Sequence, residues 1–130
     1  MAGLDAAYMY RQIAFSYKTF GPGERTEGVV DHIRKELDEV LANPRDITEW
    51  ADIIILAIDG AWRVGFEPQE IIEAVQNKLI KNEKREWPDW RTAEPGKAIE
   101  HIRMPKQSET KARVFDPADG ERIISPKPRK

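Results

Sequence analysis

Four carboxylates form two matching pairs in the central part of the chain. Glu36 and Glu39 stand three residues apart, and Glu49 and Asp52 repeat that spacing further along. Residues three apart lie on the same face of an α-helix, so each pair can direct two carboxylates the same way. All-oxygen donors of this kind are the ligands that Mg²⁺ and Mn²⁺ prefer. The pairs indicate a metal site if they do not simply face solvent.

The segments that carry these acids read as helices with clear start and stop signals. Asp5 can cap a first helix, and Asp46 with Glu49 has the spacing of a capping box. The expected helices run from Asp5 to about Thr19, from Thr26 to about Asn43, from Asp46 to about Val64 and from Pro68 to about Arg85. Short connections make neighbouring helices antiparallel, so the sequence predicts an all-α, four-helix bundle.

The second expected helix places its acids unevenly around its circumference. Glu36 falls inside the apolar stripe, Glu39 lies at the edge of that stripe, and Asp38 points to the opposite, solvent side. The stripe consists of Val29, Val30, Ile33, Leu37 and Val40. Asp38 is therefore expected on the surface, whereas the pair of glutamates is not.

The third expected helix is apolar over most of its circumference. Glu49 and Asp52 share the narrow remaining arc with Asp59 and Arg63. A plain solvent face is the simpler interpretation, with Glu49 only completing the capping box. However, a solvent face usually mixes in Lys, Gln and Ser, and this arc holds three acids and one Arg. Asp59 is left out of the metal site, because Arg63 four residues on is its natural partner.

The fourth expected helix repeats the pattern with the opposite charge. Lys78, Asn82 and Arg85 continue the apolar stripe that Ile71 and Val75 begin. They can simply extend their charged ends into water at the end of the bundle. Alternatively, an acidic metal site facing a basic helix suits a nucleotide polyphosphate, because Mg²⁺ readily shares phosphate oxygens with cationic side chains.

Composition limits the other functional classes. The net charge of −2 argues against a protein that grips a nucleic-acid backbone, and the lack of cysteine excludes disulfides and thiolate metal sites. The longest apolar run, 53–58, is far shorter than a membrane span. We therefore expect a cytoplasmic protein with no membrane or nucleic-acid partner. Four Trp in a small core also favour a homo-oligomer, a dimer or tetramer.

The chain is expected to divide into a helical domain, 1–103, and a basic, proline-rich C-terminal extension, 104–130. A short helix is expected over 97–103, and a small β-hairpin over 112–124 around Pro117 to Gly120.

Three motifs in order carry a resemblance to a known family. They are GPGER at 21–25, DGAWRVG at 59–65 and WPDWR at 87–91, together with the two acidic pairs. With them, the chain from about Gln12 to Arg103 resembles the MazG-like all-α nucleoside triphosphate pyrophosphohydrolases, and within them the dATP/dGTP pyrophosphohydrolases found often in phages. The acidic spacing alone is weakly specific, whereas the three motifs in this order are strongly so.

The resemblance implies an oligomeric bundle, a dimer or dimer of dimers, with active sites near subunit interfaces. It also implies Mg²⁺-dependent cleavage between the α- and β-phosphates of dGTP or dATP, which yields dGMP or dAMP and pyrophosphate. If the source is a phage, the enzyme would act in the host cytoplasm. One role implied for such enzymes is to supply dGMP for modified-base nucleotide synthesis.

The mechanistic hypothesis assigns a role to each candidate residue. Two or three Mg²⁺ ions, replaceable by Mn²⁺, would be held by the four acids Glu36, Glu39, Glu49 and Asp52. Glu39 would also orient the attacking water. Lys78 and Arg85 would bind the phosphates, with Asn82 positioning a phosphate or the sugar. The candidate base-binding residues are Gln12, Phe20, Trp87 and Trp90.

Two rival functions remain open on the sequence. A housekeeping pyrophosphatase of broad specificity would use the same metals and a looser pocket. A non-catalytic helical interaction module would use the acids as a solvated face and the segment 78–85 as a patch for a partner.

Overall fold

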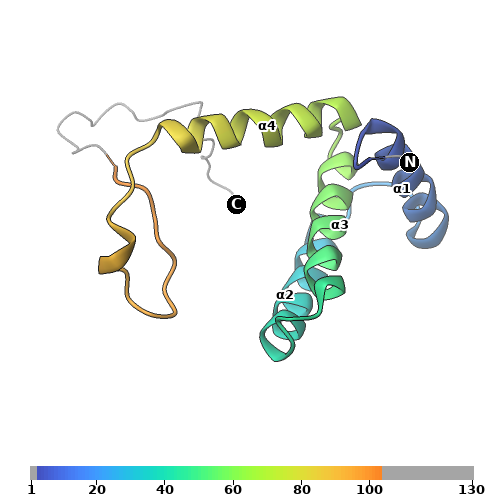
Figure 1. The fold of residues 1–130 in the computed structure, drawn as a ribbon. Helices are drawn as coiled ribbons and strands as arrows, with labels where there is room; N and C mark the ends of the chain where they lie inside the picture. The colour runs from blue at the N-terminus through green and yellow to red at the C-terminus, as the bar shows by residue number, and fades with distance from the viewer. Residues whose placement is uncertain (1–2, 104–130) are drawn as a thin grey trace. The chain divides into compact units, whose positions relative to one another are not determined.

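The computed structural model describes residues 3–103, which form four α-helices and one short 3-10 helix. Their bounds are α1 Ala6–Phe20, α2 Thr26–Ala42, α3 Ile47–Arg63, α4 Pro68–Lys84 and η1 Trp90–Thr92 (Figure 1). The described residues contain no β-strand. The prediction of an all-α fold with four helices is confirmed, with each helix end close to its expected position.

The helix ends follow from local chemistry. Asp5 caps α1 by accepting a hydrogen bond from the Tyr8 backbone N–H at 2.9 Å. Gly21 ends that helix with a φ of 87°, a left-handed conformation that favours glycine, and its N–H donates to the Tyr17 carbonyl. Pro68 occupies the first position of α4, where no intrahelical partner for an N–H is needed.

The α3 helix is the centre of the packing. It contacts both α2 and α1, and Figure 1 shows α2 and α3 side by side. Gly60 permits the close approach of α2, because a Cβ at this position would lie 3.3 Å from the Val29 Cγ1 atom. On another side of α3, Ile58 packs with Met9 of α1 and Ile71 of α4 in a buried core. The first turns of α4 are thereby tied to α1 and α3.

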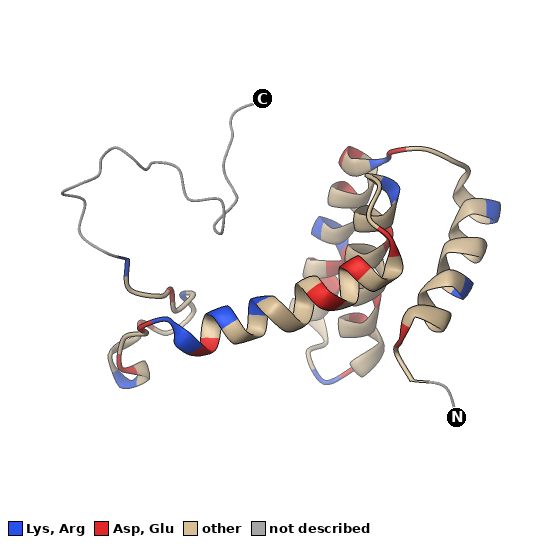
Figure 2. Cartoon of the chain, turned by 90° about the horizontal axis from the view of Figure 1, so that it is seen from above, with Lys and Arg blue, Asp and Glu red and all other residues tan. Residues whose placement is uncertain are grey.

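The rest of α4 presents an apolar face to solvent. Val75, Leu79 and Ile80 are 65%, 59% and 47% exposed. Along the helix, Glu70 and Glu73 lie near its start, and lysines together with Glu83 lie towards its end (Figure 2). A contiguous apolar face next to a basic segment is typical of a surface that binds another protein.

The predicted capping box at the start of α3 forms only in part. The Asp46 carboxylate accepts hydrogen bonds from the backbone N–H and the hydroxyl of Thr48, at 2.9 and 2.6 Å. The reciprocal bond from Glu49 is absent, because the Asp46 N–H donates instead to the Asn43 carbonyl. The Glu49 carboxylate is therefore not committed to the cap, and the capping bond predicted for this residue was wrong.

The expected short helix over 97–103 was also wrong. This segment has no helical hydrogen bonding, and the Ile102 N–H donates to the Glu86 carbonyl at 2.7 Å. A bond to a residue this distant in sequence replaces the local bonds that a helix needs. The expected hairpin over 112–124 lies outside the described residues.

The chain divides into two compact units, one up to Glu83 and one from Lys84 onward. The domain boundary expected after residue 103 stays a prediction. No helix within the described range has the length and apolar character needed to cross a membrane.

Candidate active site

Three of the four predicted metal ligands meet between α2 and α3. Glu36 of α2 and Glu49 and Asp52 of α3 each contribute an oxygen to a group in which all these atoms lie within 4.8 Å of one another. We call these three residues the carboxylate trio. They converge because the acid of α2 lies within its apolar stripe, on the side that packs against α3.

Glu36 is the least satisfied member of the trio. Its side chain is only 16% exposed, and its Oε1 atom is buried without a hydrogen-bond donor. The other oxygen, Oε2, lies 3.5 Å from the His32 Nε2 atom. A buried carboxylate oxygen without a partner costs free energy, on the order of 1–3 kcal/mol. A cation bound at this oxygen would supply the missing partner.

The pKa of the Glu49 carboxyl indicates that this residue also lacks partners that stabilise its negative charge. Loss of solvation raises the pKa of this carboxyl above its ordinary value, and the negative charges of Glu39, Asp46, Glu36 and Asp52 raise it further. By contrast, the hydrogen bonds from Thr48 lower the pKa of Asp46. Asp46 therefore has hydrogen-bond donors at its carboxylate, whereas Glu49 of the trio does not.

Glu39 lies beside the trio and outside it. Its charge is the largest electrostatic contribution to the raised pKa of Glu49, so the two carboxylates are close. The side chain is exposed. Asp38 is exposed too, as predicted. The metal-binding role expected for Glu39 stays a prediction.

A pocket of about 360 Å³ is lined at one end by Glu36 and Asp52, two members of the trio. Its lining comes from α1, α2, α3 and the turn before α2, and consists of Phe15, Phe20, Arg25, Gly28, Val29, His32, Glu36, Asp52, Ile55, Leu56 and Asp59. Asp52 and Asp59 mark its two ends along α3, about 10 Å apart at 1.5 Å per residue. Pockets of this size accept small organic ligands.

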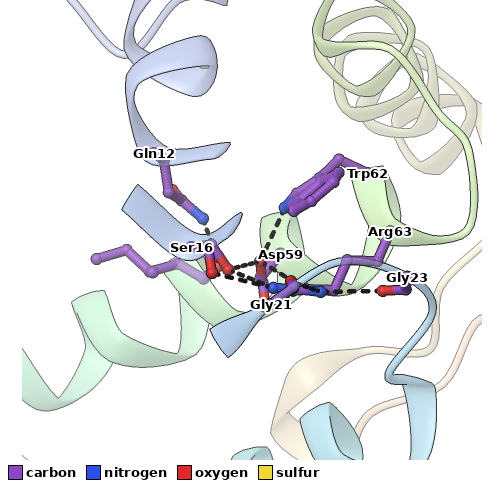
Figure 3. Close-up of polar contacts among 8 residues, drawn as sticks. Gln12, Ser16, Gly21, Gly23, Asp59, Trp62 and Arg63 are labelled. Atoms are coloured by element: carbon purple, nitrogen blue, oxygen red, sulfur yellow. Dashed lines mark hydrogen bonds and ion pairs between the residues drawn. The ribbon is translucent and has the colours of Figure 1, made fainter. Parts of the chain in front are cut away.

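Asp59 lines the end of the pocket far from the trio. It forms a buried ion pair with Arg63 (Figure 3). The Arg63 Nε atom lies 3.1 Å from the Asp59 Oδ2 atom, and the two side chains are 0% and 9% exposed. Asp59 Oδ1 also accepts bonds from the Ser16 hydroxyl and the Trp62 indole N–H. The predicted pairing of these two residues is confirmed.

The basic residues predicted on α4 do not line this pocket. Lys78 is exposed and Asn82 is half-buried. Arg85 belongs to the second unit, as do both candidate tryptophans. There, Trp87 packs edge-on against His101, and Trp90 is 70% exposed with the Arg91 guanidinium over its ring. The phosphate-binding and base-binding roles of these residues stay predictions.

The two base-binding candidates on α1 lie in different surroundings. Phe20 lines the pocket. Gln12 is buried, where its amide donates to the Ile55 carbonyl at 2.9 Å and its oxygen accepts from the Tyr8 hydroxyl at 2.8 Å. These bonds account for its burial by joining α1 to α3, and base recognition by Gln12 stays a prediction.

Among the pocket residues to which sequence reasoning assigned no site role are Phe15, Arg25 and His32. A signal existed for His32, which precedes Glu36 by one helical turn. Arg25 lies in the motif GPGER, which indicated only a family resemblance and no role for this residue. Phe15 carried no signal, because one more aromatic residue on α1 resembles core.

Comparisons with known proteins find a matching family and similar phage proteins. Residues 9–107 match the family described as dATP/dGTP pyrophosphohydrolase. The dATP/dGTP diphosphohydrolase of Cyanophage S-2L is 32% identical over 83 residues, which cover 62% of this chain and 76% of that protein. The Eaa protein of Salmonella phage P22 is 39% identical over 54 residues, 42% of this chain and 17% of that protein.

A solved structure extends the likeness to three dimensions. The Cyanophage S-2L MazG-like pyrophosphohydrolase, bound to dGDP and three catalytic Mn²⁺ ions per active site, aligns with a TM-score of 0.59 and 32% identity. The alignment covers 78% of this chain and 100% of that one.

Proposed function

The chain belongs to the dATP/dGTP pyrophosphohydrolase family, and from this premise we propose that it cleaves the α–β phosphate bond of dGTP and dATP with divalent metal ions. The observation that carries the proposal is the carboxylate trio with its unsatisfied Glu36 oxygen. A solvated acidic face would leave no carboxylate oxygen buried without a donor.

The trio fits a hard divalent cation. All its donors are carboxylate oxygens, which suit Mg²⁺ and Mn²⁺, and the chain contains no cysteine for softer metals. We propose Mg²⁺ as the cofactor, with Mn²⁺ able to replace it. The structural relative with three Mn²⁺ ions supports a site of more than one ion. When bound, such ions supply charge to the phosphates and lower the pKa of a coordinated water.

The acidic residues of the site have two different roles in the proposed reaction. Glu36, Glu49 and Asp52 would hold the metal, and the apolar residues on either side of Asp52 keep that ligand in place. Glu39 lies outside the trio and is exposed, so one of its carboxylate oxygens can accept a proton from the attacking water. The proton acceptor must lie near the water without being fully used as a ligand.

We also propose that the enzyme is a homo-oligomer in which α4 of one copy completes the pocket of another. The pocket contains one cationic side chain, Arg25, and none from α4. Meanwhile α4 carries exposed Val75 and Leu79 next to Lys78. Association through this apolar face would bring Lys78, and with it Asn82, towards phosphates held at the trio of the partner.

Mixing two impaired variants tests this arrangement. Glu36→Gln would lack an intact trio, and Lys78→Ala would bind dGTP more weakly, so hydrolysis is measured at dGTP concentrations far below KM. If α4 acts across subunits, co-refolded mixtures exceed the mean activity of the two variants, because some pockets combine an intact trio with an intact Lys78. If α4 acts within its own chain, the mixture shows only that mean activity.

The preference for purines is a further part of the proposal. The family and the relative bound to dGDP support it. A housekeeping enzyme of broad specificity is the rival, and steady-state kinetics over dGTP, dATP, dCTP, dUTP and the ribonucleotides separates the two. A flat profile would defeat the purine preference. Supply of dGMP to modified-base synthesis, in a host cytoplasm, stays a prediction.

Phosphorus NMR of the products tests the reaction itself. Cleavage at the α–β bond yields dGMP and pyrophosphate, whereas cleavage at the β–γ bond yields dGDP and orthophosphate. A non-catalytic interaction module would give neither set, and its thermal stability would not rise with Mg²⁺ and a nonhydrolysable dGTP analogue.

A further inference from the structure

Arg63 is the most completely bonded side chain at the far end of the pocket. Its Nε–H donates to Asp59, and its Nη2 group donates to the hydroxyl and the carbonyl of Ser16. Its Nη1 group donates to the carbonyls of Gly21 and Gly23, both at 2.9 Å (Figure 3). All five N–H donors of a guanidinium are thus in use, and no other side chain offers this fork.

The two carbonyls bound by Nη1 belong to the turn between α1 and α2. Gly21 and Gly23 adopt φ values of 87° and 90°, which other residues rarely adopt. These values turn both carbonyls towards one nitrogen. The motifs GPGER and DGAWRVG therefore meet in space, since the first supplies the turn and the second supplies Asp59 and Arg63.

The turn carries two residues of the pocket wall. Phe20 precedes it and Arg25 follows it, and both line the pocket. The Arg25 guanidinium lies over the Phe20 ring, 5.9 Å from its centroid, and Phe15 packs edge-on against Phe20 at 6.3 Å. An aromatic face beside a planar cation suits a nucleobase, which can stack and accept hydrogen bonds.

This wall lies at the opposite end of the pocket from the trio. The Asp59 end is about 10 Å along α3 from Asp52. If the trio holds phosphates through metal, as proposed above, the sugar and base of the nucleotide extend towards the turn.

We propose that the Asp59–Arg63 pair is a positioning device for nucleoside binding. It fixes the Gly21–Gly23 turn, and the turn fixes Phe20 and Arg25 against the base and sugar of the substrate. The inference rests on the proposed function. It adds that the Asp59 end of the pocket binds the base and sugar of the nucleotide.

Two variants release the turn in different ways. Arg63→Lys keeps a cation for Asp59 but cannot reach both glycine carbonyls, because its donors share a single nitrogen. Gly23→Ala strains the turn through its positive φ, and no atom lies within 4 Å of the added Cβ. The second variant changes the turn while both residues of the buried pair stay unchanged. Ile58→Val, a core change on α3 outside the pocket lining, is the control for general loosening.

The measurement is the kinetics of dGTP hydrolysis, with dGMP and inorganic triphosphate as competing inhibitors. Both turn variants should raise KM about tenfold, weaken inhibition by dGMP by the same factor and leave kcat within about twofold. Inhibition by inorganic triphosphate should not change, since it needs only the phosphate end. Ile58→Val should leave all these constants unchanged.

Several results would overturn the proposal. An unchanged KM in both turn variants would do so. Equal weakening of the inhibition by dGMP and by inorganic triphosphate would also overturn it, as would the same changes of KM and dGMP inhibition in Ile58→Val. Failure of both turn variants to fold would show a structural role only. Absence of hydrolysis and of metal binding in the natural chain would instead refute the proposed function, and this inference would fall with it.

Discussion

Two acids on one side of α3, seven residues apart, have opposite surroundings. Asp59 is buried and accepts hydrogen bonds from Ser16, Trp62 and Arg63. Asp52 is exposed and belongs to a group of three carboxylates in which one oxygen of Glu36 has no donor. The paired acid holds the fold together, whereas the group around Asp52 is incomplete until a cation binds. Both residues are acidic, so their charge does not distinguish them. The presence of hydrogen-bond and ion-pair partners marks Asp59 as structural, and the buried Glu36 oxygen without a donor marks the trio as a candidate metal site.

The largest effect that separates the two regions should be on catalysis. Replacing Glu36 with Gln or Asp52 with Asn should reduce hydrolysis of dGTP at least about a hundredfold, because each change removes a metal ligand. The helical circular dichroism should be unchanged. Asp38→Asn, an exposed acid on the other side of α2, is the matched control and should retain full activity. Activity equal to that of the natural chain in either ligand variant would refute the metal site.

The free energy of unfolding should fall in one region and not in the other. Asp59→Ala leaves the buried Arg63 charge without its carboxylate partner and should cost about 3–5 kcal/mol of unfolding free energy. Glu49→Gln removes a carboxylate that its neighbours repel, and should leave the metal-free protein equally stable or more so. Urea unfolding in the presence of a chelator measures both. A loss of stability in Glu49→Gln as large as that in Asp59→Ala would erase the contrast.

Lys78 on α4 should affect substrate binding more than folding. Its side chain is exposed, so Lys78→Ala should leave the melting temperature unchanged. If Lys78 binds the phosphates, KM for dGTP should rise about tenfold, in line with the loss of one charge-assisted contact. Lys84→Ala, a charge change at the end of the same helix, is the control. Equal kinetics for the two variants would remove Lys78 from the site.

The smallest effect should come from Asp46, the capping acid of α3. Asp46→Asn keeps a capping group but loses the charge, so the melting temperature at neutral pH should fall by about 1–3 °C. Hydrogen bonds from Thr48 hold the pKa of Asp46 below its ordinary 3.8. A lowered pKa contributes stability above the ordinary value, and that stability is lost as pH falls through the folded pKa. The melting temperatures of the variant and the natural chain should therefore converge as the pH falls well below 3.8, and a constant gap would contradict this assignment.

The sequence predicted the helices and the trio for the same reason, which is periodicity. Apolar spacing located each helix, and the position of Glu36 within a stripe marked it as facing a neighbour. The pairing of Asp59 with Arg63 followed equally from a spacing of four residues. These are local relations, and a single chain records them well.

The parts that escaped prediction depend on contacts between distant residues. The bonds from Arg63 to Gly21 and Gly23 join residues about forty positions apart in sequence. Likewise, the half-formed capping box depends on a competing carbonyl at Asn43, which sequence spacing does not weigh. The spacing on α4 likewise placed Lys78 towards the core, but that side chain is exposed.

The central claim is that the carboxylate trio is a divalent metal centre. Electron paramagnetic resonance of Mn²⁺, titrated into the protein with an α,β-nonhydrolysable dGTP analogue, tests it most directly. The natural chain should bind two or three Mn²⁺ ions per pocket, and Glu36→Gln should lose that binding while Asp38→Asn keeps it. Equal Mn²⁺ binding by the natural chain and Glu36→Gln would contradict the account.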